Sequence, residues 1–279
     1  MNPKMLSRLL GALVLAGAFP VAGQDLRGFE RVLLPIFLPA DTPGLNESHF
    51  TTGPSFSAFS HEPFQVFPYY ASFDAEPTVG TNRAEYPFAL LEGPRSAGRF
   101  VWIPRTDAHR VWFSHSIESW STGSAPETAE LPVVRESGFL DQATVLYPVP
   151  FQWRYESDDP LWRQPIPVYR RTLRVYAFGP ETGASVSVIL WLGNLGPGAP
   201  PLRTFELALD RRDGEDPSWP VYGTADLPDV CIPFSAHTPC LESTTIQLEI
   251  LPATTGLRYW AFVTAVENTT QHVRVIVPR

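Results

Sequence analysis

Lysine is the scarcest charged residue of this chain. Lys4 is the only lysine, so nearly all of the 21 Lys and Arg residues are arginines. Once the first residues are removed no lysine remains, which excludes Schiff-base chemistry, the lysine of a phosphate-binding loop and a Ser-Lys dyad. Cysteine is almost as rare, with only Cys231 and Cys240.

Short catalytic motifs are missing as well. The chain has no HExxH zinc motif, because His61 and Glu62 are followed by Pro63. It has no GxSxG nucleophile elbow, no phosphate-binding loop, no GxGxxG and no Cys/His spacing typical of zinc. These absences argue against the commonest motif-bearing enzymes. They leave open a glycosidase, which needs only two carboxylates and shows no local motif.

The first 23 residues predict a secretory signal peptide. Lys4 and Arg8 give a positive start, an apolar run follows over 9–19, and small residues precede a cut before Gln24. This run is too short to span a bilayer, and no later stretch reaches the ~20 apolar residues that a span requires. We therefore expect an exported protein, secreted or periplasmic, with no transmembrane span in the mature chain.

The charge balance is acidic. The formal net charge is -8, the sequence pI is about 5.3 and no basic stripe stands out, so nucleic acid is not an expected partner. Hydrophobic residues make up 44% and charged residues 18% of the chain. A chain of this composition can bury a core and is not disordered.

The two cysteines predict a disulfide. Cys231 and Cys240 lie close together in an exported chain, and such pairs close small loops in oxidising compartments. Metal binding by the pair with His237 is the alternative, but no fourth ligand is near in the sequence. A disulfide here would stabilise the fold by ~2–3 kcal/mol.

Proline content and hydrophobic periodicity predict an all-β fold. The chain has 30 prolines, about twice the usual ~5%, and proline interrupts helices. In the second half, apolar and polar residues alternate with period two, as in half-buried strands. The expected strands are 169–178, 184–192, 203–210, 246–250, 257–266 and 273–277. Their spacing predicts an immunoglobulin-like antiparallel β-sandwich in the C-terminal half.

The first half shows the strand pattern less clearly. The expected strands are 31–38, 99–103, 110–115 and 145–149, with weaker candidates at 64–67 and 84–91 and a long loop over 39–63. Five prolines within 146–167 predict a domain boundary. We therefore expect a signal peptide over 1–23, a β-rich N-terminal domain over 24–150 and the sandwich over 151–279. The alternative is one large sandwich with a decorated loop.

An aromatic group after this boundary is the candidate binding site. It consists of Trp153, Tyr155 and Trp162, with Asp158 and Asp159 close in sequence. Exposed rings stack on the apolar faces of sugars while carboxylates accept hydrogen bonds from hydroxyls, so the group predicts a sugar platform. The alternative is that the rings cover a domain junction, because Trp is largely buried on average.

An acidic segment is the candidate metal site. Asp210, Asp213, Glu215 and Asp216 surround Gly214 and suggest a calcium loop, although their spacing does not fit the EF-hand pattern. The alternative is a solvated connecting loop, and calcium is the only cofactor that the sequence suggests.

The histidines give weaker signals. Asp107, His109 and His115 share one face of an extended strand, but the two histidines would lie ~20 Å apart, too far to ligate one metal ion. We expect them in turn and edge positions. His272, before the last strand, is expected to be an edge or cap residue.

Scattered strand-like stretches carry a resemblance to other proteins. They read LRYWAFVT and NTTQHV near the C-terminus, ERVLLP after the signal peptide, LPVVRE from Leu131 and RTLRVY from Arg171. Together they resemble a group of exported proteins of unknown activity from GC-rich, soil-type bacteria such as Acidobacteria. The stretches are spread over most of the mature chain. The resemblance implies an all-β exported fold and transfers no activity or functional residue.

These observations predict an exported, non-catalytic binding or surface-interaction protein. Its ligand would be a glycan or another protein of the cell envelope, because sandwich loops suit both. The first alternative is an exported polysaccharide hydrolase that uses two carboxylates, with Asp158, Asp159, Glu156 and Glu118 as nominal candidates. The second is a purely structural envelope component.

Overall fold

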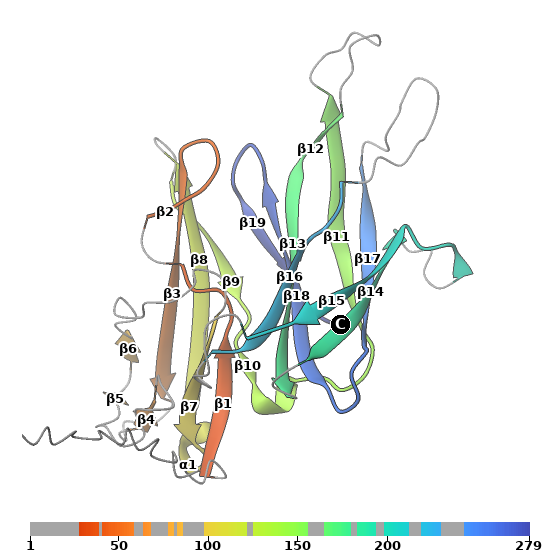
Figure 1. The fold of residues 1–279 in the computed structure, drawn as a ribbon. Coiled ribbons are helices and arrows are strands. Elements are labelled where there is room, and N and C mark those ends of the chain that lie inside the picture. Colours follow the sequence, from red (N-terminus) through yellow and green to blue (C-terminus); the bar gives the residue numbers. More distant parts are fainter. Residues whose placement is uncertain are drawn as a thin grey trace, which may run out of the picture.

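The fold was described from a computed structural model. The residues described are 28–38, 41–58, 64–67, 78–80, 83–85, 98–121, 125–155, 165–179, 183–193, 198–211, 219–229 and 243–279. Within them, helical structure is limited to α1 (Arg105–Ala108), a 3-10 turn at Glu136–Gly138 and single 3-10 residues at Gly28 and Gly198. Most of the other described residues lie in antiparallel strands, so the predicted all-β class is confirmed (Figure 1). The signal peptide and both cysteines, Cys231 and Cys240, lie outside the described residues.

The C-terminal half is a sandwich of two antiparallel sheets (Figure 1). One sheet has the order β12-β11-β17-β14-β15 and the other the order β16-β13-β18-β19. The strands are β11 (Thr144–Tyr155), β12 (Pro165–Pro167), β13 (Tyr169–Gly179), β14 (Ala184–Leu192), β15 (Arg203–Leu209), β16 (Val221–Asp226), β17 (Ser243–Pro252), β18 (Arg258–Glu267) and β19 (Val273–Ile276). The strands expected in the second half are present, and the predicted sandwich is confirmed.

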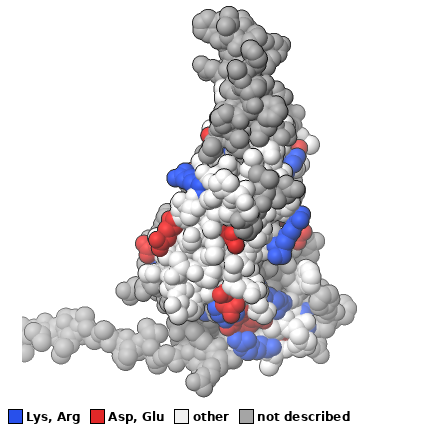
Figure 2. Space-filling model, turned by 90° about the vertical axis from the view of Figure 1, so that its right-hand side faces the viewer, with Lys and Arg blue, Asp and Glu red and all other residues white. Residues whose placement is uncertain are grey.

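The sandwich core follows from the period-two pattern. In β14, Val186, Val188 and Leu190 point inward and are at most 1% exposed. They meet Leu173 and Val175 of β13, which belongs to the facing sheet. Each such side chain contributes about 1.5–3 kcal/mol when it is fully buried. Figure 2 shows the side of the molecule that lies on the right in Figure 1. On this side, arginines and acidic side chains of the described residues are mixed and do not form separate positive and negative patches.

The boundary between the two halves lies earlier in the chain than the sequence suggested. β11 runs without interruption through residues 150 and 151, where the domains were expected to meet. Leu146 and Val149 already belong to the sandwich core. Prolines in this strand therefore did not mark a linker, and the sandwich begins at Thr144.

Tyr259 ties the sandwich to the segment that precedes it. It lies near the start of β18, is fully buried, and its hydroxyl is 2.8 Å from the carbonyl oxygen of Ile250 and 2.9 Å from that of Gln142. Its backbone also pairs with Leu140 through two 2.8 Å hydrogen bonds. A tyrosine at this place, bonded to backbone upstream, is the tyrosine corner of immunoglobulin-like sandwiches. Burial raises the pKa of the Tyr259 hydroxyl.

The N-terminal half consists of three smaller sheets. Their orders are β10-β1-β7, then β2-β3-β8-β9 with β6 paired to β3, and β4-β5. The strands are β1 (Phe29–Leu34), β2 (Thr42–Pro43), β3 (Ser48–Ala58), β4 (Phe64–Val66), β5 (Thr78–Gly80), β6 (Arg83–Glu85), β7 (Arg99–Pro104), β8 (Val111–Ser121), β9 (Glu127–Leu131) and β10 (Val134–Arg135). The second β-rich region predicted before the sandwich is thus present.

The β10-β1-β7 sheet is buried on both faces. On one face, Val32 and Leu34 of β1 join Val101 of β7 in a core shared with β8. On the other face, Leu33 and Phe100 pack in a core shared with β13 and β18 of the sandwich. A sheet covered on both sides needs apolar residues at nearly every position, which explains the continuous runs in β1 and β7.

The outer face of the sandwich meets this sheet through a row of aromatic rings. Tyr222, Tyr176 and Phe262 come from the neighbouring strands β16, β13 and β18. The Tyr176 ring stacks against Tyr222 at 6.1 Å and against Phe262 at 6.2 Å between ring centres. Such cross-strand pairs contribute about 0.5–1.5 kcal/mol beyond their buried area. The row therefore joins the two halves into one packed body.

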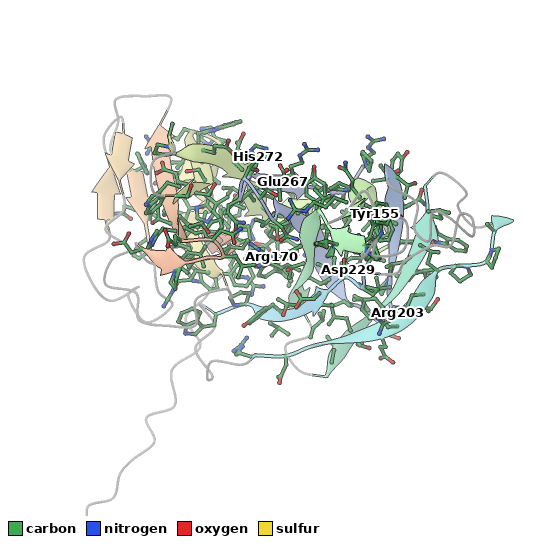
Figure 3. All side chains as sticks on the ribbon, turned by 90° about the horizontal axis from the view of Figure 1, so that it is seen from above. Tyr155, Arg170, Arg203, Asp229, Glu267 and His272 are labelled. Atoms are coloured by element: carbon green, nitrogen blue, oxygen red, sulfur yellow. The ribbon has the colours of Figure 1, made fainter. Side chains whose placement is uncertain are left out.

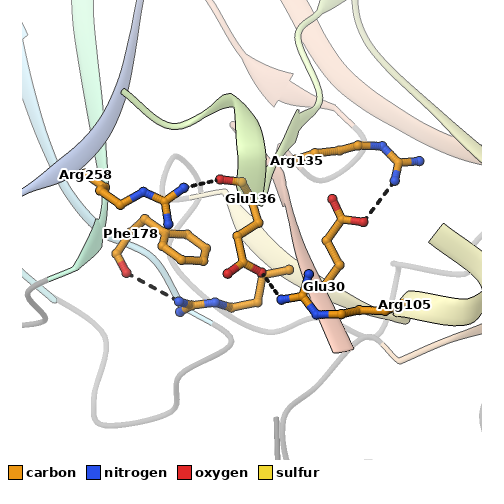
Figure 4. A network of polar contacts seen from close by, with 7 residues as sticks. Glu30, Arg105, Arg135, Glu136, Phe178 and Arg258 are labelled. Carbon is orange, nitrogen blue, oxygen red and sulfur yellow. Dashed lines mark hydrogen bonds and ion pairs between the residues drawn. The ribbon is translucent and has the colours of Figure 1, made fainter. Parts of the chain in front are cut away.

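Polar contacts close one end of this junction (Figure 4). The Arg31 guanidinium lies 3.7 Å from the centre of the Phe178 ring and donates to the Phe178 carbonyl. Arg258 of the sandwich donates to the backbone carbonyl of Glu136. The side-chain carboxylate of Glu136 accepts a 3.1 Å hydrogen bond from Arg105. Arg31 and Arg258 thus link the sandwich to the N-terminal half.

A second set of polar contacts closes the other end. Arg170 of β13, which is labelled in Figure 3, donates to Gln271 at 2.8 Å and to the Asn268 side chain at 3.0 Å. Asn46, in the turn before β3, donates to the Asn268 carbonyl at 2.7 Å. Ser48 donates to the buried Gln271 at 3.4 Å. The turn after β18 is thereby bonded to the start of β3.

Strand β3 corrects the prediction of a loop over 39–63. Its Gly53 and Pro54 are residues typical of turns, so the segment was not recognised as a strand. Nevertheless every residue of β3 pairs with β8, from Ser48 opposite Ser121 to Ala58 opposite Val111. Pairing with the strongly alternating strand β8 therefore outweighs the low strand preference of Gly53 and Pro54.

The Tyr259 contact gives a stability prediction. Tyr259→Phe removes the one hydroxyl hydrogen that the carbonyl oxygens of Ile250 and Gln142 share, and should lower the free energy of unfolding by about 1–3 kcal/mol. Tyr147→Phe is the matched control, because the Tyr147 hydroxyl has no hydrogen bond among the described residues. Urea unfolding of both variants measures the difference. Equal stability of the two variants would contradict the role given to Tyr259.

Candidate functional site

The outer face of the β3-β8-β9 sheet is the candidate site, and we call it the tryptophan–serine face. Its residues alternate with those that point into the two N-terminal cores. The members are His49, Thr51 and Gly53 of β3, Trp112, Ser114, Ser116, Glu118 and Trp120 of β8, and Thr128 and Glu130 of β9.

The alternation within β8 creates this face. Val111, Phe113 and Ile117 point inward and join the cores, each at most 8% exposed. The intervening residues carry small hydroxyl groups, a carboxylate and two tryptophans. Because successive side chains of a strand point to opposite faces, the two sets separate cleanly. One face stabilises the fold, and the other is left to meet solvent or a ligand.

Tryptophans lie toward the two ends of the face. Trp112 is 62% exposed, which is unusual for so large an apolar side chain. Trp120 stacks on His49 of β3, with 5.9 Å and 17° between the rings. The two tryptophans are eight positions apart in β8, so they lie about 26 Å apart along the strand at ~3.3 Å per residue.

Hydroxyl groups and carboxylates occupy the middle of the face. Gly53 lies opposite Ser116, and Ser116 lies opposite Glu130 of β9. In the next row, Thr51, Glu118 and Thr128 lie side by side. Gly53 has no side chain, so the centre of the face stays low between the aromatic ends.

His115 anchors the strand from below. It is 1% exposed, and its Nε2 lies 2.9 Å from each of the carbonyl oxygens of Pro35 and Ile36. Two acceptors at Nε2 assign the proton of the neutral ring to this nitrogen. Burial lowers the pKa of His115 to about 4, and the backbone hydrogen bonds oppose this shift only in part.

The structure corrects the predicted sugar platform at Trp153. This ring is only 7% exposed and packs edge-on against Phe151 inside the sandwich. Beside it, Arg171 is buried with its guanidinium 4.6 Å from the Phe151 ring and ion-paired with Asp229. Burial lowers the pKa of Arg171, and Asp229 opposes the shift. A buried indole cannot stack on a sugar, so Trp153 serves the core.

The other members of that predicted group are not brought into a site. Tyr155 ends β11 in a half-buried position. Trp162, Asp158 and Asp159 lie outside the described residues, as does Glu156.

The predicted calcium loop is only partly described. Asp210 is exposed, and its backbone exchanges two 3.0 Å hydrogen bonds with Tyr222. Asp213, Glu215 and Asp216 lie outside the described residues. Among the side chains that the structure does describe, no group of three His, Cys, Asp or Glu residues is placed to hold a metal ion. Calcium therefore stays a prediction from the sequence.

The remaining histidine predictions concern turns and edges. Asp107 and Arg110 form an ion pair at 2.7 Å beside α1, where His109 is exposed. For His115 the prediction of a turn or edge position was wrong, because this residue is buried in β8, which lies between β3 and β9. His272 precedes the edge strand β19, and its Nδ1 lies 2.6 Å from the Glu127 carboxylate of β9.

Sequence reasoning missed the tryptophan–serine face. The signal was nevertheless in β8, where Trp112 alternates with Val111 and Phe113 and shares its parity with Ser114 and Ser116. A tryptophan in the polar half of an alternating strand indicates a ring that the core does not need.

Comparisons with known proteins add little to this picture. No family model and no curated protein matches the chain. Among solved structures, the crystal structure of the infectious bursal disease virus VP2 subviral particle is similar at 10% identity and a TM-score of 0.21. That match covers 90% of this chain and 71% of the other, and a likeness this weak carries no functional argument. No helix among the described residues is long and apolar enough to cross a membrane.

The buried His115 gives a prediction of pH dependence. Its folded pKa of about 4 lies below the 6.5 of an exposed histidine, so the unfolded state binds the proton first as the pH falls. The stabilisation is complete above pH 6.5 and is lost between pH 6.5 and 4, by about 3 kcal/mol at most.

The matching measurement is urea unfolding between pH 7.5 and 4. His115→Gln keeps an amide donor for the two carbonyls and should flatten this part of the stability profile. His109→Gln changes an exposed histidine and should leave the profile as it is. Identical pH profiles for the natural protein and the His115 variant would contradict the prediction.

Proposed function

We propose that this protein is an exported, non-catalytic binding protein whose ligand is a glycan, bound on the tryptophan–serine face. The observation that carries the proposal is Trp112, exposed at 62% in line with a row of serines. Indole rings stack on the apolar faces of sugars, and hydroxyl and carboxylate oxygens bond to sugar hydroxyls. The signal peptide predicted from the sequence supports export, with a secreted or periplasmic location.

The length of the face favours an extended chain over a single sugar. The rings of Trp112 and Trp120 lie about 26 Å apart along β8, at ~3.3 Å per residue. A polymer lying along the strand would reach both rings and the hydroxyl rows between them. An envelope protein is the second candidate partner, since exposed tryptophans are also common in protein interfaces.

Hydrolysis is favoured less than binding. Glu118 and Glu130 are diagonal neighbours across β8 and β9, at positions about 7–8 Å apart, and a glycosidase likewise requires two carboxylates. Both are exposed on an open sheet. A general acid is usually held in an apolar pocket that tunes it, and neither carboxylate has such a surrounding here.

Trp112→Ala tests the proposal. The variant should bind polysaccharide at least about tenfold more weakly, as expected for loss of a large aromatic contact. Its stability should change by less than about 0.5 kcal/mol, because the ring is exposed. Val277→Ala, which removes another exposed apolar side chain, is the control and should bind like the natural protein.

Binding is measured by co-sedimentation with a panel of insoluble polysaccharides and by a glycan array. Equal binding by both variants and the natural protein would show that the glycan binds elsewhere than on this face. Failure to bind any glycan would overturn the proposal and direct the search to protein partners. Release of reducing ends that disappears in Glu118→Gln would instead establish the hydrolase.

A further inference from the structure

The acidic groups of the tryptophan–serine face narrow the ligand class. Resting on the function proposed above, we propose that the face selects a cationic amino-sugar polymer, in which unacetylated amino groups are protonated. The argument uses the positions of Glu118 and Glu130, the charge of the face and the nearness of Trp120.

The two carboxylates are placed to share one cation. Glu118 lies opposite Thr128, and Glu130 lies opposite Ser116, so the two glutamates are diagonal neighbours on one face. Diagonal residues of an antiparallel pair lie about 7–8 Å apart, within reach of long side chains. Two exposed like charges at this separation repel each other only weakly in the free protein, because solvent and salt screen them. An ammonium group between them removes the repulsion and gains two charge-assisted contacts.

The charge of the whole face favours a cation. The members named above include two carboxylates and no arginine, and the chain has no lysine after Lys4. The register adds one position of each charge at the edge of the face, Glu85 and Arg83 of β6, opposite Ser55 and Ser57 of β3. At the Trp120 end, the Asp41 side chain is 78% exposed and lies 4.0 Å from the ring of His49. An acidic polysaccharide would be repelled by this surface, whereas a neutral one would gain no ionic contact from it.

The aromatic contact and the acidic contact fall within reach of one sugar unit. Trp120 and Glu118 are two residues apart on the same face of β8, about 7 Å along the strand. A ring stacked on the indole therefore places its substituents beside the Glu118 carboxylate. Ser116 and Thr128 flank the same position with hydroxyl groups. The polymer would thus be recognised both by stacking on Trp120 and by its charge beside Glu118.

The test compares three soluble β-1,4-linked hexamers by calorimetry at pH 6. These are a glucosamine hexamer, its N-acetylated counterpart and a glucose hexamer. The natural protein should bind the glucosamine hexamer at least about fivefold more tightly than the other two, and this preference should shrink as salt is added. The double variant Glu118→Gln with Glu130→Gln should bind all three alike. Glu206→Gln, an exposed glutamate on β15, is the control for net charge.

The outcomes separate this proposal from the one on which it rests. A preference that survives in the double variant, or equal binding of the three hexamers by the natural protein, overturns the selection of cations. If Trp112→Ala then weakens binding of all three, glycan binding on this face still holds. Absence of binding to every hexamer, on the array and to insoluble polysaccharide overturns both proposals.

Discussion

The burial of the β10-β1-β7 sheet on both of its faces is the constraint on which the molecule depends. Leu33 and Phe100 pack toward the sandwich, while Val32 and Val101 pack toward β8. A sheet this apolar could not be left exposed on either side, because each buried side chain contributes about 1.5–3 kcal/mol. The sandwich and the β3-β8-β9 sheet are therefore held together through this layer rather than by a flexible linker.

That layer also determines which surface remains for a ligand. Packing against it takes up the inner face of β8, and His115 fixes the strand by bonding to the carbonyls of Pro35 and Ile36. Only the outer face of β8 stays in contact with water, and it carries Trp112 and Glu118. The proposed binding surface is thus rigid because its reverse side is part of a core. A rigid, preformed surface loses little conformational entropy when it binds.

Local patterning predicted the sandwich well and the first half poorly. Strands such as β14 and β18 alternate or are continuously apolar, so their own residues specify them. Strand β3 has Gly53 and Pro54 at its centre, and it is a strand because β8 pairs with it along its whole length. The same limit applies to the prolines of β11, which suggested a boundary although the strand continues through them. Pairing partners that are distant in sequence were not visible in either case.

The candidate site shows which part of a surface can be predicted. Trp153 was expected on the surface, but it shares its parity with Val149 and Phe151 and is buried with them. Trp112 shares its parity with serines and is exposed. For each tryptophan, the other residues on the same side of its own strand therefore predict whether the ring is buried or exposed. Carboxylates that are close in sequence do not predict this. The placement of Glu118 and Glu130 as diagonal neighbours depends on the register of β8 with β9, which only the structure provides.

The most direct measurement of the central claim is an NMR titration that follows the indole N–H signals of the eight tryptophans while a glycan is added. The account predicts that the signals of Trp112 and Trp120 shift, while those of the core residues Trp153 and Trp260 stay in place. Shifts confined to the sandwich tryptophans, with Trp112 and Trp120 unmoved, would contradict it.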